Sequence, residues 1–360
     1  MCAEEVFCNG KRTFILIFEI MIGPFPLGKF WHSKWGVVLF LALAIATIFI
    51  LRKSNSAVPQ YDEGPIFGTV YHIKYKYERN LNKEILAELN RVDNSMSFFN
   101  PTSTISKINA GTDSKTDELF REVFSLAKNI SKETNGAFDI TVAPLVNAWG
   151  FGFKTQQLPT KSQVDSLRSL VGFSKVNLDG TTVKKTDPRV MLDCGAIAKG
   201  FGVDCVARLF DRLGIRDYMI EIGGEVRTHG KNFEGKQWTI GIQRPVAGED
   251  EVLSVMHLQE KALATSGNYR NFYVKNGRRY AHTIDPRTGY PVQHSLLSAS
   301  IIASDCATAD AYATSFMVLG LDGAKEVLSK HPELKAYLIY EQNGKLQVWM
   351  SPGLEKNIVE

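Results

Sequence analysis

The chain has 360 residues, 44% of them apolar, and a formal net charge of +4. A chain of this size can bury a large hydrophobic core without disulfide or metal cross-links. Its Lys and Arg residues are scattered and form no basic stripe, so composition gives no reason to expect a nucleic-acid partner.

One apolar run near the N-terminus predicts a membrane segment. Residues 36–51 contain no charge, follow Trp31 and Trp35, and are followed directly by Arg52-Lys53. The run lies at the short end of the lengths that span a bilayer. A cleaved signal peptide is the alternative, but the basic pair and the lack of a small-residue cleavage site favour a retained single-pass anchor.

The predicted anchor divides the chain. Residues 1–35 form an N-terminal cytoplasmic segment without a strong pattern, as expected if the start codon was assigned too far upstream. The balance of basic residues across the anchor slightly favours export of the main domain. Residues 52–64 are polar, contain Pro59 and Gly64, and are predicted to be a linker. Residues 65–360 then form one compact domain.

The domain is predicted to be α+β, with largely antiparallel or mixed sheets flanked by helices. Strands and helices interleave without the regular alternation of a βαβ fold. Helices are expected at 83–92, 117–134 and 199–213, and strands at 68–75, 218–222, 238–243, 252–258, 272–274, 298–303, 335–340 and 346–350.

The five cysteines stand at positions 2, 8, 194, 205 and 306, and no pair has the spacing of metal ligands. Only three of them follow the apolar run, and an odd number there argues against a disulfide framework. Cys194, Cys205 and Cys306 each lie among small or apolar residues. We therefore expect all three to be buried free thiols.

A run of small residues predicts a further helix, bounded by Ser304-Asp305 and Gly320. It carries Asp310 and Thr314, whose spacing of four residues puts both side chains on one helix face. Carboxylate and hydroxyl oxygens suit a hard cation such as Mg²⁺. The alternative is an Asp near the helix N-terminus and a Thr bonded to its own helix, and the run alone favours that alternative.

Two clusters contain groups that suit a planar ligand. Phe98 and Phe99 are adjacent in a polar turn, where they either stack on a ring or fill the core. Asp139 lies in an apolar stretch and needs partners, because an unpaired buried carboxylate is costly. Those partners are either main-chain N–H groups or the amide edge of a heterocycle.

Two more clusters suit phosphate and proton chemistry. Residues 192–202 are rich in Gly and Ala at a strand-to-helix junction, where helix N–H groups and Lys199 can receive a phosphate. The spacing of the glycines matches neither the Walker motif nor the GxGxxG motif. His282 precedes an Asp-Pro turn, which favours exposure to a cleft. A lone His is more often a structural residue than a catalyst.

Taken together and in order, the motifs resemble the ApbE family of FAD:protein FMN transferases. They are Met-Ser, Gly-Ala-Phe-Asp-Ile-Thr-Val, Leu-Asp-x-Gly-x-Ile-Ala-Lys-Gly, Ile-Gly-Gly, Thr-Ser-Gly-Asn-Tyr, His-x-Ile-Asp-Pro-x-Thr-Gly and Ala-Asp-Ala-x-Ala-Thr. The resemblance extends from about Phe67 to residues 349–352, nearly all of the chain beyond the expected anchor.

The resemblance implies an exported, Mg²⁺-dependent enzyme of the bacterial inner membrane whose catalytic domain faces the periplasm or exterior. Such an enzyme splits FAD, attaches FMN to a Thr or Ser of an acceptor protein, and releases AMP. Family acceptors include redox subunits of the quinone reductase and Rnf types. An FAD pyrophosphatase and a flavin-binding protein without turnover are the alternatives.

The resemblance also assigns roles to particular residues. The metal ligands would be Asp310, Thr314 and the main-chain carbonyl of Ala196, and His282 would act in the transfer step. The residues lining the FAD site would be Phe67, Ser97, Phe98, Phe99, Asp139, Lys199 and Ile284. The chain departs from relatives at Phe67, Phe98-Phe99 and Ala313, the last of which removes an Asp that some relatives carry near the metal.

Overall fold

The structure is a computed structural model. It describes residues 38, 41, 42, 44, 45, 57–152, 158–246, 251–268, 272–275 and 278–359, with main chain alone at 272–275, 278 and 279. Two compact units divide between Ala57 and Val58. The expected segment 1–35 and most of the expected anchor 36–51 lie outside the described residues. Among those that are described, no helix has both the length and the apolar character needed to cross a membrane.

The prediction of a linker over 52–64 is wrong for its second half. β1 (Val58–Ile66) pairs antiparallel with β2 (Thr69–Tyr77) along its whole length. β1 lies at the edge of the main sheet, where a strand needs hydrogen-bond partners on one side only. Prolines such as Pro59 and Pro65 are tolerated there. The composition that suggested a linker is therefore that of an edge strand.

The main sheet is antiparallel throughout, which confirms the α+β fold with antiparallel sheets. Its eight strands have the order β1-β2-β5-β6-β9-β12-β13-β14. The strands not yet located are β5 (Tyr218–Ile222), β6 (Glu225–His229), β9 (Ala262–Gly267), β12 (Leu296–Ala303), β13 (Lys335–Gln342) and β14 (Lys345–Met350). Three hairpins stand apart: β3 (Val176–Asp179) with β4 (Thr182–Lys185), β7 (Thr239–Gln243) with β8 (Val252–His257), and β10 (Phe272–Lys275) with β11 (Arg278–Ala281).

Among the described residues, the larger unit has seven α-helices. They are α4 (Asn82–Met96), α5 (Thr104–Ala110), α6 (Glu118–Glu133), α7 (Ala143–Ala148), α8 (Lys161–Arg168), α9 (Ala198–Arg212) and α10 (Cys306–Lys330). α6 shows clear signals at both of its ends. At the start of α6, the side chain of Asp117 accepts the N–H of Phe120. Just beyond its end, Asn135 and Gly136 both have left-handed backbones.

The helical segment after β12 is interrupted at Gly320, where the sequence predicts that this helix ends. Gly320 has φ 72° and ψ −176°, which is not helical, and a second helical segment of α10 continues from the kink to Lys330. A Cβ on Gly320 would lie 3.2 Å from the ring of His294. That imidazole bonds the carbonyl of Met317 at 2.8 Å, just before the kink. The glycine therefore separates two helical segments of α10 and packs beside a histidine.

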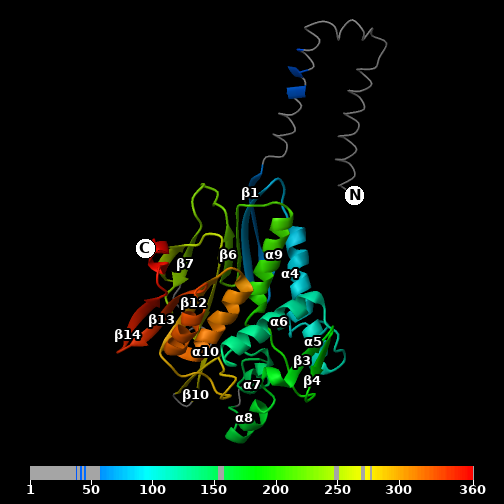
Figure 1. Ribbon diagram of the computed structural model, residues 1–360, viewed down its shortest axis with the longest axis vertical. Helices are drawn as coiled ribbons and strands as arrows, with labels where there is room; N and C mark the ends of the chain where they lie inside the picture. The colour runs from blue at the N-terminus through cyan, green and yellow to red at the C-terminus, as the bar shows by residue number, and fades with distance from the viewer. Residues whose placement is uncertain are drawn as a thin grey trace. The chain divides into compact units, whose positions relative to one another are not determined.

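Helices and a hairpin cover opposite faces of the main sheet (Figure 1). α4 and α9 pack on β2 and β5 through a core that includes Tyr71, Phe210 and Ile220. The β7–β8 hairpin packs over β6, β9 and β13 through residues such as Met256 and Ile339. The site described below lies at the junction of these layers.

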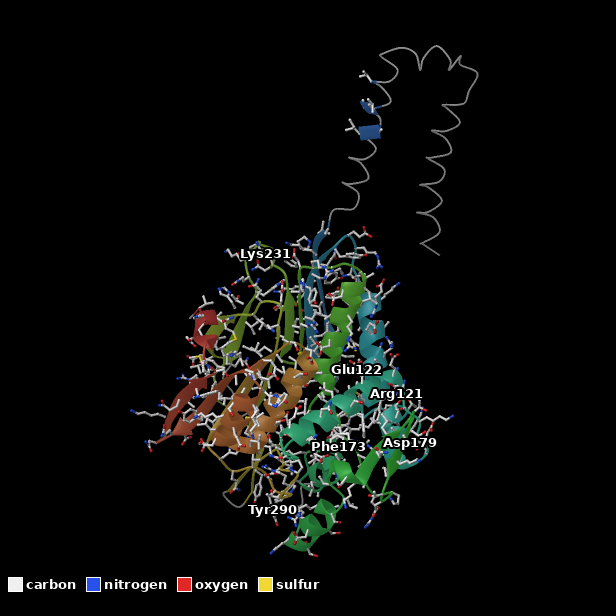
Figure 2. All side chains as sticks on the ribbon, in the orientation of Figure 1. Arg121, Glu122, Phe173, Asp179, Lys231 and Tyr290 are labelled. Atoms are coloured by element: carbon white, nitrogen blue, oxygen red, sulfur yellow. The ribbon has the colours of Figure 1, made fainter. Side chains whose placement is uncertain are left out.

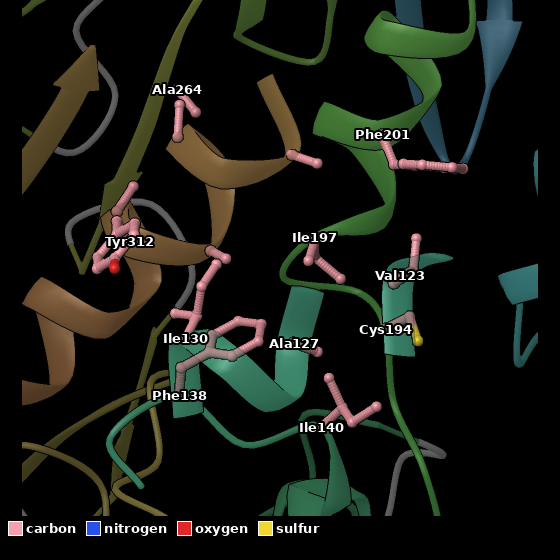
Figure 3. Close-up of a cluster of buried hydrophobic side chains, with 14 of the residues drawn as sticks. Val123, Ala127, Ile130, Phe138, Ile140, Cys194, Ile197, Phe201, Ala264 and Tyr312 are labelled. Atoms are coloured by element: carbon pink, nitrogen blue, oxygen red, sulfur yellow. The ribbon is translucent and has the colours of Figure 1, made fainter. Parts of the chain in front are cut away.

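A second core joins α6, α10 and the segment before α9 (Figure 3). Cys194 and Ile197 of that segment belong to the same buried cluster as Val123 and Ala127 of α6, and Tyr312 joins it from α10. Cys194, Cys205 and Cys306 are all buried free thiols, as predicted. Figure 2 shows Glu122 on the outer side of α6, where its Oε2 accepts from Arg208 of α9 at 2.9 Å.

Candidate functional site

One cavity of about 940 Å³ collects most of the residues expected to carry chemistry. It extends between the main-sheet face, β7 and the loops around His282. The expected site residues that line it are Asp139, Ala196, Lys199, His282, Ile284, Asp310 and Thr314. Its volume is at the upper end of the range of small-molecule and cofactor sites. Residues from four separate motifs therefore meet around one space large enough for a dinucleotide.

The remaining expected flavin-site residues are not among the described residues that line this cavity: Phe67, Ser97, Phe98 and Phe99. Phe67 has a left-handed backbone and packs against Gly202 of α9, where a Cβ would lie 2.7 Å from the ring. The rings of Phe98 and Phe99 lie 4.1 Å apart, and Phe98 lies near Gly195, next to Ala196. The aromatic pair thus lies beside the glycine-rich segment.

The N-terminal ends of α9 and α10 meet at Asp310. Its Oδ2 accepts the main-chain N–H of Gly200 at 3.1 Å. In an uninterrupted helix that N–H would donate to the carbonyl of Ala196. Within the part of the chain that the structure describes, no main-chain N–H donates to the Ala196 carbonyl. The oxygen expected to be a metal ligand is therefore left available beside the carboxylate expected to be another.

The two helices approach closely because residue 200 is glycine. A Cβ there would lie 2.3 Å from the carbonyl oxygen of Cys306. The start of α10 is also held by Asp204 of α9, whose carboxylate accepts the N–H groups of Cys306 and Ala307. Asp204 is itself paired with Arg227 of β6 at 2.5 Å. This buried network fixes the position of the helix turn that carries Asp310.

Three charged groups stand together at this junction. Lys199 Nζ lies 2.7 Å from Glu225 Oε1 and 3.8 Å from Asp310 Oδ2. Burial opposes the charge on Lys199, but the negative charges of Asp310 and Glu225 outweigh it, so the pKa of Lys199 is raised. Burial raises the pKa of Glu225, and the positive charge of Lys199 opposes that shift.

Thr314 faces β9 across the cavity wall. Its Oγ1 lies 3.1 Å from Ser266 Oγ, and the neighbouring Thr265 Oγ1 lies 2.8 Å from Ser300 Oγ. Farther along the same segment, Asn268 Oδ1 accepts the hydroxyl proton of Thr283 at 2.8 Å. The Thr-Ser-Gly-Asn motif thus connects the expected metal site to the loop of His282.

His282 lines the cavity, and its ring lies edge-on to Phe151, with 6.4 Å between the ring centroids. Asp285, on the same loop as His282, pairs with Arg287 at 2.9 Å. Asp193, which also lines the cavity, accepts the N–H of Gly195 at 2.7 Å. Both carboxylates thus support the turns in which they lie.

Asp139 is bonded by its own loop and by the segment that begins at Phe173. Its Oδ1 accepts the hydroxyl and the N–H of Thr141, and its Oδ2 accepts the N–H of Phe173 at 3.1 Å. Two of these three donors are main-chain N–H groups, one of the alternatives left by the sequence. Burial raises the pKa of Asp139, while the Thr141 bonds oppose that shift. Its loop joins the glycine-rich segment where Asp193 N–H donates to the Ile140 carbonyl at 2.7 Å.

The donors at this junction fit a hard cation better than a soft one. In the part of the chain that the structure describes, no three His, Cys, Asp or Glu side chains form a metal-binding group. A cation held here would use one carboxylate, a hydroxyl and a carbonyl, the oxygen types that Mg²⁺ accepts.

Sequence reasoning missed two residues of this site, Glu225 and Ser266. Glu225 follows the Ile-Gly-Gly motif, and Ser266 lies in the Thr-Ser-Gly-Asn motif. Both motifs are part of the family resemblance, but the resemblance assigns a role to neither residue. Their importance comes from contacts with α9 and α10 that the sequence does not display.

Comparison with known proteins agrees with this geometry. Residues 67–338 match the family model described as the ApbE family. The chain belongs to the ApbE family. It is 42% identical over 311 residues to the FAD:protein FMN transferase of Haemophilus influenzae, covering 81% of this chain and 90% of that protein. It is 33% identical to the FAD:protein FMN transferase of Escherichia coli K12, covering 89% and 97%.

Solved structures of the ApbE family give the same result. The flavin transferase ApbE from Vibrio cholerae superposes with a TM-score of 0.76 at 31% identity, covering 84% of this chain and 99% of that one. Flavinyl transferase ApbE of Pseudomonas stutzeri in its apo form gives a TM-score of 0.75 at 27% identity. The family-model match over residues 67–338 includes every motif described above.

Proposed function

We propose that this chain is an FAD:protein FMN transferase that moves FMN from FAD to a Thr or Ser hydroxyl of an acceptor protein. The observation that carries the proposal is the meeting of Lys199, Asp310, Thr314 and His282 around one cavity. In the proposed reaction, the acceptor oxygen bonds to the phosphorus of the FMN half. The phosphoanhydride bond to the other half breaks, and AMP leaves.

The chain's own residues have distinct tasks in this proposal. Lys199 and the N–H groups at the start of α9 receive the negative charge of the pyrophosphate. Asp310, Thr314 and the Ala196 carbonyl would hold a Mg²⁺ ion. When bound, such an ion neutralises charge that develops on the phosphate oxygens as the anhydride bond breaks.

His282 accepts the proton of the acceptor hydroxyl. A Thr or Ser hydroxyl is a weak nucleophile at neutral pH, so a base within reach of the attacking oxygen accelerates the reaction. The edge-on contact with Phe151 supports the imidazole on one side. Phe67, Ser97, Phe98, Phe99, Asp139 and Ile284 remain proposed FAD-site residues, although the first four lie outside the cavity in the described structure.

The test is incubation of the chain with FAD, Mg²⁺ and a candidate acceptor, such as a redox subunit of the quinone reductase or Rnf type. Transfer gives in-gel flavin fluorescence on the acceptor, together with AMP. Release of FMN and AMP without labelled acceptor would replace this proposal with an FAD pyrophosphatase. If FAD remains unchanged, the result would favour a flavin-binding protein without turnover.

We also propose that residues 36–51 anchor the enzyme in the bacterial inner membrane, with its catalytic domain facing the periplasm or exterior. The uncharged run and the basic pair that follows it support this location. Fractionation of cells that express the whole chain tests the proposal. Recovery of an uncleaved chain in the soluble fraction would contradict it.

A further inference from the structure

Glu225 is a buried carboxylate that uses only part of its hydrogen-bonding capacity. It begins β6 and is 2% exposed. Its Oε1 lies 2.7 Å from Lys199 Nζ. Its Oε2 is shielded from water and has no hydrogen-bond partner among the described residues. A buried polar atom left in this state costs about 1–3 kcal/mol, more if charged.

A second buried ion pair also joins β6 to α9, and it serves as a comparison for Glu225 and Lys199. Arg227 of β6 pairs with Asp204 of α9, and both Asp204 oxygens are used, because they also accept the first N–H groups of α10. Glu225 and Lys199 join β6 to α9 in the same way but leave one oxygen unused. Stability alone therefore does not account for Glu225, since an incompletely satisfied buried pair contributes little.

The distances around Lys199 suggest what Glu225 does. Lys199 is 29% exposed in the cavity and within reach of two carboxylates. Glu225 holds the ammonium at hydrogen-bonding distance, whereas Asp310 is 3.8 Å away. Lys has a long, flexible side chain with three donors. Without Glu225, the only other carboxylate paired with Lys199 in the described structure is that of Asp310.

We propose that Glu225 is a positioning residue that keeps Lys199 at the cavity wall and off Asp310, so that the ammonium faces the phosphates of a bound dinucleotide. The inference rests on the proposed function. Glu225 acts through Lys199 and touches no reacting atom. It also leaves Asp310 free to bind a cation, because an ammonium paired with Asp310 would compete for the same oxygen.

The experiment compares Glu225→Gln with the wild-type chain by titration with FAD, ADP and riboflavin. Glutamine keeps the shape and removes the charge. FAD and ADP both carry a pyrophosphate, and we expect their affinities to fall about tenfold, as for loss of one hydrogen bond to a charged group. Riboflavin has no phosphate, so its affinity should not change. Glu88→Gln is the control, because Glu88 also pairs with a basic residue of α9, Arg212, but is not among the described residues that line the cavity.

A double-mutant cycle separates positioning from a general structural role. In a Lys199→Met background, Glu225→Gln should cause no further loss of ADP affinity. An equal loss in both backgrounds would overturn the inference, and so would an equal loss of riboflavin affinity or normal ADP affinity in Glu225→Gln alone. If Glu225→Gln does not fold, as judged by thermal unfolding, Glu225→Asp replaces it. Its shorter side chain should also weaken ADP binding selectively.

The outcomes distinguish the two proposals. A wild-type chain that binds FAD and ADP, with a Glu225→Gln variant that binds both equally well, overturns the positioning role alone. A wild-type chain that binds neither compound overturns both the positioning role and the proposed function. If Glu225→Gln selectively loses affinity for ADP and FAD while the wild-type chain labels no acceptor, the positioning role is supported and the transfer reaction is removed.

Discussion

Asp310 Oδ2 accepts a hydrogen bond from the main-chain N–H of Gly200 at 3.1 Å, and this contact joins the first turns of α9 and α10. It turns the Gly200 N–H away from the Ala196 carbonyl and brings a carboxylate to the N-terminal end of α9. A carboxylate is favoured at that end, where the helix N–H groups carry partial positive charge. The spacing of the two helices therefore sets the geometry of the proposed metal site.

Gly200→Ala should separate the helices and destabilise the protein. The new Cβ would lie 2.3 Å from the Cys306 carbonyl, a main-chain atom that cannot rotate away. We expect a loss of about 1–3 kcal/mol in urea unfolding, typical of overpacking. Gly202→Ala is the control on the same helix, because its new Cβ meets the far end of the Phe67 ring. Alanine's helix propensity offsets about 1 kcal/mol there. Equal losses would show that helix contact is not the cause.

Asp310→Ala should abolish product formation while weakening FAD binding less. The variant removes the only carboxylate among the three proposed metal ligands, but leaves Lys199 and the helix N–H groups to bind phosphate. Flavin fluorescence titration measures FAD binding, and chromatography measures AMP release. Removal of divalent cations with EDTA should stop turnover by the wild-type chain, and Mg²⁺ should restore it. Turnover that is equal with and without EDTA would remove the metal from the proposal.

Asp204 and Asp211 provide a matched test of buried and exposed ion pairs on one helix. Asp204 is buried, pairs with Arg227 and caps α10. Its replacement by Ala should cost about 3–5 kcal/mol, because Arg227 then loses its buried partner. Asp211 pairs with Arg216 at 3.8 Å on the surface. Asp211→Ala should cost less than about 1 kcal/mol. Similar losses in urea unfolding would mean that the Asp204 network does not hold the junction.

The parts of the site that sequence predicts are those set by local geometry. Asp310 and Thr314 share a helix face because their spacing requires it, and Asn135-Gly136 closes α6 because left-handed residues end helices. The pairing of Lys199 with Glu225 depends instead on how β6 packs against α9. No local pattern reports that contact, so Glu225 was missed.

The features that were predicted wrongly or incompletely from the sequence also depend on contacts between distant elements. The polar, proline-containing residues 58–64 are read as a linker because only pairing with β2 shows them to be an edge strand. Gly320 signals a helix end in sequence and does interrupt α10, but the second helical segment that follows it to Lys330 was not predicted. Phe98 and Phe99 are recognisable as an aromatic pair, yet whether such a pair lines a cavity depends on surrounding elements.

His282→Ala should retain FAD binding and lose acceptor labelling. The imidazole is proposed to take the acceptor proton, and such a base contributes about 10²–10⁴-fold to rate. In-gel flavin fluorescence over a time course measures labelling, and titration measures FAD affinity. His294→Ala is a control for loss of an imidazole elsewhere, since His294 bonds the Met317 carbonyl in α10. Undiminished labelling by His282→Ala would assign the proton transfer to another group.

The three cysteines of the catalytic unit should resist alkylation while the protein is folded. Cys194, Cys205 and Cys306 are buried, and burial raises the pKa of each thiol, that of Cys205 to about 12. Alkylation requires the thiolate, which is scarce well below the pKa. Iodoacetamide at pH 8, followed by peptide mass spectrometry, should therefore leave all three unmodified in buffer and modify them in urea. Peptide-level detection separates them from Cys2 and Cys8, which lie outside the described residues. Rapid labelling of Cys306 in buffer would show that the α9–α10 junction opens readily, because its thiol is enclosed beneath that contact.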